Sequence, residues 1–321
     1  MAEIVGRPDE IPLVAIVGPT GAGKTALAVA LARAWPIEAV SVDSRQVYRR
    51  MDIGTGKPTP DERRLLRHHL LDLVEPDEPY DAARFARDAA AAIADIHARG
   101  PRPVLVGGTG LYLKALLHGL SPLPPADLEL RRRLRADAAT EGRAALHRRL
   151  EELDPETAAR LHPRDLMRVT RALEIALVTG RPASASRGRG RPATASPYRV
   201  LTIGLTMARG DLYARLEARV DRMLAEGLLR EVEGLLAAGF GPDLPAMQGI
   251  GYRHLTPVLT RGASLDEAVS AMKRDTRRYA KRQWTWFARV QVAHWVTVEA
   301  DDVAGATGQV KRMIETAGIF G

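Results

Sequence analysis

The stretch Gly18-Pro19-Thr20-Gly21-Ala22-Gly23-Lys24-Thr25 decides the fold predicted for this chain. It matches the P-loop pattern G-x-x-x-x-G-K-[ST], in which a glycine-rich turn joins a strand to a helix. An apolar run, residues 11–18, precedes it, and a helix-like stretch, residues 24–34, follows it. The turn amides and the helix N-terminus predict a phosphate or pyrophosphate site, with Lys24 at the outer oxygens and the Thr25 hydroxyl placed for Mg²⁺, the expected cofactor.

Two further apolar runs end in residues that suit the same site. Asp43 directly follows residues 38–42, and Gly107-Gly108-Thr109-Gly110 directly follows residues 103–106. A helical stretch, residues 80–98, lies between these two runs. Strands that alternate with helices predict a parallel sheet whose ligand site lies at the carboxyl ends of the strands. A carboxylate at such an end, Asp43, can take a proton or bind metal, and the alternative for a lone aspartate is a turn or cap residue.

The pattern changes after residue 120. Ser121-Pro122-Leu123-Pro124-Pro125 interrupts it, and residues 126–179 then show helical periodicity, many arginines and no convincing strand. Residues 181–197 are rich in Gly, Pro, Ser, Ala and Arg, which is typical of an exposed flexible connection. We therefore expect a helical insertion at this point of the chain.

The chain then returns to the sheet. Residues 198–205 form another strand-like run, and long helices are expected over residues 212–238 and 265–290. The predicted fold is α/β, with a P-loop NTPase-like parallel sheet flanked by helices and a helical insertion domain. The predicted domains are a catalytic core of residues 1–122 and 198–321 and a helical insertion of residues 123–197.

The charge balance favours a polyanionic partner. The 321 residues include 47 Lys and Arg against 39 Asp and Glu, for a net charge of +8 and a pI near 10.0. Only six of these cations are lysines, a bias that GC-rich coding also produces. Near the carboxyl end, Arg274, Arg278 and Arg282 recur every four residues and share one helix face. This face would suit binding to a phosphate backbone, and the alternative is a solvated helix face.

Several classes of protein are excluded by composition. The chain has no cysteine, so disulfide frameworks, cysteine-ligated zinc, iron–sulfur clusters and thiol catalysis are ruled out. There is no run of about 18 apolar residues and no signal-peptide pattern at the start, so we expect neither membrane insertion nor secretion. The expected compartment is the cytoplasm, and we expect a monomer with no obligate protein partner.

Further motifs follow the P-loop in a characteristic order. They are Asp43-Ser44-Arg45-Gln46-Val47-Tyr48, Met51-Asp52-Ile53-Gly54-Thr55-Gly56-Lys57-Pro58, His68-His69-Leu70, Gly107-Gly108-Thr109-Gly110-Leu111-Tyr112, Arg168-Val169-Thr170-Arg171-Ala172-Leu173-Glu174, Gln248-Gly249-Ile250-Gly251-Tyr252 and Lys281-Arg282-Gln283-Trp284-Thr285-Trp286-Phe287. Taken together, their order and spacing closely resemble the tRNA dimethylallyltransferase, or tRNA isopentenyltransferase, family over roughly residues 11–290.

This resemblance implies a reaction and its partners. Members of that family transfer a dimethylallyl group from dimethylallyl diphosphate to the exocyclic amine of the adenosine 3′ to the anticodon, in tRNAs that read codons beginning with U. Diphosphate leaves. The implied partners are therefore dimethylallyl diphosphate and the anticodon stem-loop of tRNA.

The resemblance also implies roles for single residues. Asp43 matches the general base, and Thr20 and Arg219 match residues that act on the prenyl donor. The residues that match the diphosphate-binding loop are Gly18, Pro19, Thr20, Gly21, Ala22, Gly23, Lys24 and Thr25. The residues that match tRNA contacts are Asp43, Ser44, Arg45, Gln46, Thr109, Arg131, Met167, Arg168, Val169, Thr170 and Arg171.

The sequence departs from the family pattern at three positions. Arg45 stands where an apolar or small residue is usual, Arg50 where glycine is usual, and Met167 where a polar residue is usual. These departures concern local tRNA contacts and leave the P-loop and Asp43 unchanged.

Two other functions fit parts of the pattern. A P-loop small-molecule or nucleoside kinase would also use the phosphate site, and the helical stretch 127–149 could serve as its arginine-rich lid. A P-loop ATPase or switch that binds nucleic acid would also suit the positive charge. Consumption of ATP distinguishes both from a prenyltransferase, which needs none.

Overall fold

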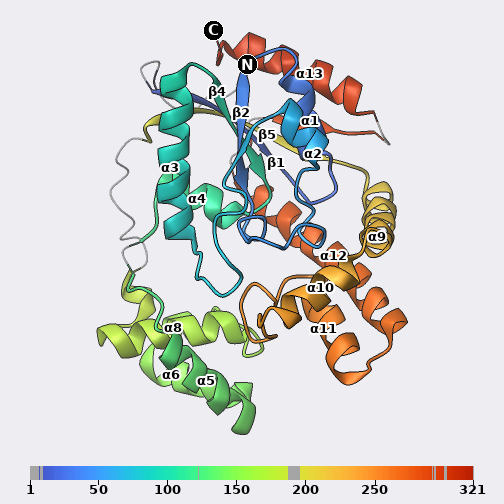
Figure 1. Cartoon of the computed structure of the whole chain (residues 1–321). Helices are drawn as coiled ribbons and strands as arrows, with labels where there is room; N and C mark the ends of the chain where they lie inside the picture. The colour runs from blue at the N-terminus through green and yellow to red at the C-terminus, as the bar shows by residue number, and fades with distance from the viewer. Residues whose placement is uncertain are drawn as a thin grey trace. The chain divides into compact units, whose positions relative to one another are not determined.

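The computed structural model describes residues 7, 10–121, 123–186, 196–290, 292, 294–299 and 302–320. The chain divides into two compact units, Met1–His118 with Ala195–Gly321, and Gly119–Thr194. The first is built around a parallel sheet and the second is helical (Figure 1). The α/β fold with a parallel sheet flanked by helices is therefore confirmed. Residues 187–195, the centre of the predicted flexible connection, lie outside the described residues.

The first unit contains a six-stranded sheet in the order β3-β2-β4-β1-β5-β6, and every pair is parallel. Its strands are β1 Ile11–Val17, β2 Ile37–Val42, β3 His68–His69, β4 Arg102–Gly107, β5 Tyr198–Thr206 and β6 His294–Thr297. Its helices are α1 Lys24–Leu31, α2 Pro60–Leu65, α3 Ala82–Arg99, α4 Gly110–His118, α9 Arg209–Ala225, α10 Leu228–Ala237, α11 Tyr252–Arg261, α12 Leu265–Phe287 and α13 Val303–Ala317.

Both faces of the sheet are buried, as continuous apolar strands require. Leu13, Ala15 and Val17 of β1 pack on one face with α3 and α4, whereas Val14 and Ile16 pack on the other with α1 and α13. Figure 1 shows these helices on opposite sides of the strands. Because β1 lies between β4 and β5, the turn that follows it opens near the middle of the sheet edge.

The carboxyl-terminal helices differ in part from the prediction. The single helix expected over residues 212–238 is wrong, because Gly227 at φ +104° separates α9 from α10. A left-handed residue ends one helix and lets the chain start another in a new direction. Strand β6 was not predicted, because a four-residue strand gives little periodic signal. Helix α13, which follows it, was not predicted either.

The second unit is helical, as predicted. It contains α5 Leu128–Thr140, α6 Arg143–Leu153, α7 Pro155–Ala158, α8 Leu166–Thr179 and a short 3₁₀ turn, Ala183–Ser186, with no strand among its described residues. Leu134, Leu146, Leu150, Val169 and Leu173 form its small core.

One carboxylate fastens the edge of the sheet. Glu38 on β2 accepts hydrogen bonds from Arg99 Nη1 and Nη2 at 2.5 and 2.8 Å and lies 2.6 Å from His69 Nε2 on β3. Only 10% of its side chain is exposed. These contacts hold the pKa of Glu38 near 2, mainly through the hydrogen bonds from Arg99. Glu38 thereby joins β2, β3 and the end of α3.

We expect Glu38→Gln to lower the free energy of unfolding at pH 7 by about 2 kcal/mol, because buried charge-assisted bonds are lost. A depressed folded-state pKa stabilises the protein above the unfolded value of 4.5, and this contribution is lost as pH falls through about 2. Urea denaturation should therefore show the two proteins converging between about pH 4.5 and pH 2.

The matched control is Asp95→Asn, which removes the exposed carboxylate that contacts the same Arg99 at 2.9 Å. This exposed pair should contribute less than about 1 kcal/mol. A difference between Glu38→Gln and the wild type that is equal at pH 7 and pH 3 would contradict the assignment.

Candidate active site

The P-loop lies between β1 and α1 and leaves its helix N-terminus open. Gly18 has φ +134°, and a Cβ there would lie 2.3 Å from the carbonyl oxygen of Leu205 on β5. Gly23 caps α1 at φ +87° without a side-chain hydrogen bond. The first N–H groups of α1 therefore remain available to an anion, where the helix dipole also favours negative charge.

A cavity of about 940 Å³ opens beside this loop. Its lining comes from the P-loop, from the segments after β2 and β4, and from α9 and α12. Lys24, Arg215, Arg219 and Arg222 give it positive charge, and Asp43 stands among them. Such a mixture suits an anionic ligand beside a group that exchanges a proton.

Burial opposes the charges of the groups in the cavity. It lowers the pKa of Lys24 to about 8, although the negative charge of Asp43 acts in the opposite direction. Burial also raises the pKa of Asp43, and the hydrogen bonds from Arg45 and Gln46 counteract that rise. The pKa of Arg219 is lowered by burial as well. A bound polyanion would satisfy both cations.

Asp43 is held at the end of β2 by its own turn. Its Oδ1 accepts the backbone N–H groups of Arg45 and Gln46 at 2.8 and 3.3 Å. Its Oδ2 has no hydrogen bond among the described residues. The carboxylate therefore has a fixed direction and one free oxygen in the cavity.

Thr109 joins the turns after β2 and β4. Its N–H donates to Val42 O at 3.1 Å, and its Oγ1 accepts from Ser44 N at 3.1 Å. Tyr279 of α12 lies near the same group: burial and the charge of Asp43 raise its pKa to about 12, and the Thr109 side chain acts in the opposite direction. Three of the predicted residues, Asp43, Ser44 and Thr109, thus lie together.

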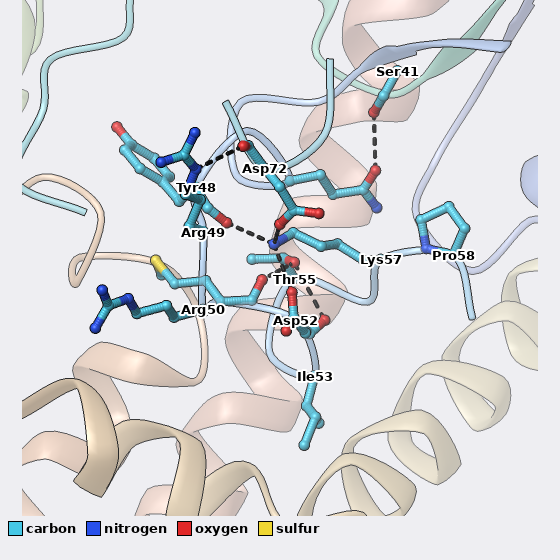
Figure 2. A network of polar contacts seen from close by, with 12 residues as sticks. Ser41, Tyr48, Arg49, Arg50, Asp52, Ile53, Thr55, Lys57, Pro58 and Asp72 are labelled. Atoms are coloured by element: carbon cyan, nitrogen blue, oxygen red, sulfur yellow. Dashed lines mark hydrogen bonds and ion pairs between the residues drawn. The ribbon is translucent and has the colours of Figure 1, made fainter. Parts of the chain in front are cut away.

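Residues 52–57 form a second wall, and a buried lysine fixes it (Figure 2). Only 2% of the Lys57 side chain is exposed. Its Nζ donates to Tyr48 O at 2.6 Å and contacts Asp52 Oδ1 at 2.6 Å and Asp72 Oδ1 at 2.5 Å. Because the cation is paired with two carboxylates, we assign it a structural role.

Glu231 of α10 holds the same wall from the opposite direction. Its Oε2 accepts the N–H groups of Asp52 and Ile53 at 2.8 and 2.7 Å, and its Oε1 accepts that of Gly54 at 3.0 Å. The buried Tyr252 hydroxyl donates to the same carboxylate at 2.6 Å. Three successive amides around one carboxylate form an anion nest that is occupied by a side chain of the chain itself.

The wall in turn contacts a predicted site residue. A Cβ at Gly56 would lie 1.7 Å from Arg219 Nη2, so only glycine leaves room for that guanidinium. Gly56 O accepts from Gln46 Nε2 at 3.1 Å, and Gln46 Oε1 accepts from Ser41 at 2.9 Å. The positions of Gln46 and Arg219 therefore depend on this wall.

The structure shows the surroundings of the three residues that depart from the family pattern, Arg45, Arg50 and Met167. Arg50 has φ +63°, a conformation that glycine adopts without strain, and its side chain contacts Glu75 at 3.1 Å and lies over the Phe240 ring. Arg45 Nη1 donates to Pro245 O at 2.7 Å. Met167 at the start of α8 is 79% exposed. Thus Arg45 and Arg50 are engaged within the chain.

The predicted insertion residues lie in the second unit. Arg131 and Arg171 both contact Glu174, a fully buried carboxylate, at 2.9 and 2.6 Å. Arg168 is exposed, whereas Val169 and Thr170 are buried. Glu174 also accepts the N–H of Asp127 at 2.6 Å, so it fixes both arginines at the start of α5 and α8. Val169 packs in the core of this unit.

The donor set for a divalent cation is small. The described residues contain no group of three or more His, Asp or Glu side chains that could hold a metal. Thr25 lines the cavity with a hydroxyl. Mg²⁺ commonly uses one or two protein oxygens together with substrate phosphates and water, so this site fits an ion that arrives with a phosphorylated ligand.

Four residues in this region had no role in the prediction: Lys57, Glu231, Tyr279 and Gln283. Gln283 and Lys57 lie within motifs that the sequence analysis identified, but those motifs did not indicate a role for either residue. Glu231 had no such signal, because its amide partners lie about 180 positions away in the chain.

No helix in the described part of the chain is long and apolar enough to cross a membrane.

Comparison with known proteins gives consistent results. A family model described as IPP transferase matches residues 46–290, and one described as isopentenyl transferase matches residues 11–78. A tRNA dimethylallyltransferase of Geobacter sulfurreducens is 51% identical over 289 residues, which are 90% of this chain and 93% of that protein. One of Syntrophobacter fumaroxidans is 50% identical over 305 residues, 95% of this chain and 87% of the relative.

Solved structures are similar over nearly the whole chain. A tRNA isopentenylpyrophosphate transferase of Bacillus halodurans is 41% identical with a TM-score of 0.70, covering 96% of each chain. A eukaryotic dimethylallyltransferase acting on tRNA is 31% identical with a TM-score of 0.76, covering 97% of this chain and 79% of that one.

The pKa of Lys24 predicts how anion binding depends on pH. Lys24 is charged below about pH 8 and loses its charge as pH rises through that value. Inorganic pyrophosphate, measured by calorimetry between pH 7 and pH 9.5, should bind the wild type progressively more weakly than Lys24→Arg, by up to about tenfold per pH unit above the pKa. Arginine keeps its charge throughout this range. Parallel curves for the two proteins would contradict the prediction.

Proposed function

The chain belongs to the IPP transferase family, and from that premise we propose that it transfers a dimethylallyl group from dimethylallyl diphosphate to the N6 amine of the adenosine 3′ to the anticodon. The tRNAs concerned read codons that begin with U, and diphosphate is released. The enzyme class is that of a tRNA-modifying prenyltransferase. The observation that carries the finer proposal is that Lys24, Arg219 and Asp43 line one cavity beside an open P-loop.

The cavity suits both ends of a prenyl diphosphate. Lys24, Arg219 and the free N–H groups of the P-loop can hold the diphosphate. Ile53, Val106 and Met223 contribute apolar side chains to the same lining, which suits a five-carbon chain. The arrangement therefore supports an amphiphilic donor.

Asp43 is the proposed general base. The adenine amine is a poor nucleophile, because its lone pair is delocalised into the ring, so removal of its proton as the C–N bond forms assists the reaction. Oδ2 of Asp43 is free to accept that proton, while Oδ1 stays bonded to the turn. The raised pKa of Asp43 makes it a stronger base than an ordinary aspartate.

The P-loop and Arg219 are proposed to stabilise the leaving group. The C–O bond of the donor breaks, and its electron pair leaves with the diphosphate. Negative charge develops there, and Lys24, Arg219 and the loop amides can stabilise it as it grows. Mg²⁺ held by Thr25 together with the diphosphate oxygens would supply further positive charge. Thr20, which also lines the cavity, is proposed to contact the donor.

The tRNA is proposed to bind at basic surfaces of the chain. The target adenine must leave the anticodon stack, which costs a few kcal/mol, roughly. Arg131, Arg168 and Arg171 in the second unit and the Arg274, Arg278 and Arg282 row on α12 are the proposed phosphate contacts. All three residues of that row are exposed, with Arg278 3.3 Å from Asp275 and Arg282 over the Tyr279 ring. Among the nearby aromatics, Phe287 is a core residue.

The reaction is tested with labelled dimethylallyl diphosphate and unmodified tRNA in the absence of ATP. We expect label transfer, and we expect Asp43→Ala to reduce its rate by about 100-fold to 10,000-fold while tRNA binding is largely preserved. The reason is that one carboxylate contributes little to affinity among many phosphate contacts. Near-normal kcat for Asp43→Ala would refute the base assignment.

The same assay separates the alternative functions. Tight ATP binding with release of the γ-phosphate, and no label transfer, would favour the kinase or ATPase function. Omitting tRNA gives the background rate of donor hydrolysis.

We expect the triple variant Arg274→Ala, Arg278→Ala, Arg282→Ala to bind tRNA more weakly. Affinity should also depend less on salt, since each phosphate contact in single-stranded RNA contributes about −0.7 to the slope of log K against log salt. Binding of dimethylallyl diphosphate should remain nearly unchanged. Filter binding across a salt series measures both quantities.

The matched control removes three exposed arginines elsewhere in the same unit, Arg33, Arg87 and Arg312. It lowers the net charge equally but leaves α12 intact. If both triple variants change the slope by the same amount, the row has no specific part in tRNA binding.

A further inference from the structure

The backbone N–H groups of the P-loop are unevenly available. Pro19 has no N–H, the Thr20 N–H donates to Gln283 Oε1 at 2.8 Å, and the Ala22 N–H donates to Pro19 O at 3.3 Å. Within the described part of the chain, the N–H groups of this turn and of the first turn of α1 that make no hydrogen bond are those of Gly18, Gly21, Gly23, Lys24, Thr25 and Ala26. Five of these six free donors therefore lie between residue 21 and the first turn of α1.

The first half of the loop presents acceptors instead. Lys24 Nζ donates to Gly18 O at 3.0 Å and to Pro19 O at 2.8 Å. The Lys24 ammonium covers these carbonyl oxygens, so a phosphate at this end of the loop meets that cation and few backbone N–H groups. The loop can therefore surround one end of a polyphosphate and offers little to a longer one.

Gln283 of α12 fills the space next to this first half. The residue is 6% exposed, and its Nε2 donates to Gly108 O at 2.9 Å. A Cβ at Gly108 would lie 2.1 Å from that nitrogen, which shows how closely the amide fits against the turn after β4. Both ends of the Gln283 amide are thus used, one on each of the two turns that border the cavity.

We propose that Gln283 determines the length of the phosphate chain that the P-loop accepts. It occupies the Thr20 N–H and the space beside it, so a third phosphate finds no backbone donor there. A phosphate that is buried without hydrogen bonds is strongly disfavoured, whereas a diphosphate can use the five free N–H groups of Gly21, Gly23, Lys24, Thr25 and Ala26. This inference rests on the proposed function, because it explains why a P-loop would take a prenyl diphosphate and reject a nucleoside triphosphate.

The test compares inorganic pyrophosphate with inorganic tripolyphosphate by calorimetry at one pH and ionic strength. In Gln283→Ala the Thr20 N–H and the space beside it become free. The affinity for tripolyphosphate relative to pyrophosphate should then rise at least about tenfold over the wild type. The matched control is Thr285→Ala, an exposed position on the same helix, which should keep the wild-type ratio.

A second variant gives a change in the opposite direction. Gln283→Glu keeps the volume and an acceptor for the Thr20 N–H but adds a negative charge beside the outer phosphate. The affinity for tripolyphosphate relative to pyrophosphate should fall below that of the wild type. This variant decides the question if circular dichroism shows that Gln283→Ala is unfolded.

The outcomes separate two failures. An unchanged ratio in folded Gln283→Ala overturns the inference even if both anions bind more weakly, since that result would mean a structural role alone. An unchanged or higher ratio in Gln283→Glu overturns it too. A wild-type protein that binds neither anion would overturn the proposed function and, with it, this inference, whereas normal pyrophosphate binding with an unchanged ratio overturns the inference alone.

Discussion

Lys24 and Asp43 lie in one cavity, where burial opposes the charge of each. The pKa of Lys24 falls to about 8 and that of Asp43 rises, while the attraction between the two counteracts both shifts. The site therefore holds a cation that gains from a polyanion and a carboxylate that gains from a proton. Each of the two groups is held by other partners: the Lys24 ammonium donates to P-loop carbonyls, and the Asp43 carboxylate accepts from its own turn.

The supporting contacts come from helices that are distant in the chain. Glu231 and Tyr252 hold the wall formed by residues 52–57, and Gln283 joins the P-loop to the turn after β4. Glu231 and Gln283 do so through hydrogen bonds to backbone groups, and Tyr252 holds the Glu231 carboxylate. The carboxyl-terminal helices therefore complete a site whose chemical groups come mostly from the first 110 residues.

Charge is used differently in the two units. In the sheet unit, the cations Lys24 and Arg219 line a cavity and have depressed pKa values. In the helical unit, Arg131 and Arg171 share the buried Glu174, which orients them and reduces the net charge that they present. An oriented guanidinium suits a defined phosphate contact, whereas the exposed row on α12 suits a contact that tolerates movement.

The sequence alone determined the P-loop, the alternation that builds a parallel sheet and the helical insertion, because each depends on spacing within a short stretch of chain. It also determined the family, because the order of the motifs can be read along the chain. It also singled out Asp43, Lys24 and Arg219. Only the tertiary structure revealed the amide nest around Glu231, the break at Gly227 and the bridge made by Gln283. The physical reason is that these features depend on donors and acceptors brought together from positions about 170 to 260 residues apart, or on a single backbone angle, and neither leaves a periodic pattern in the sequence.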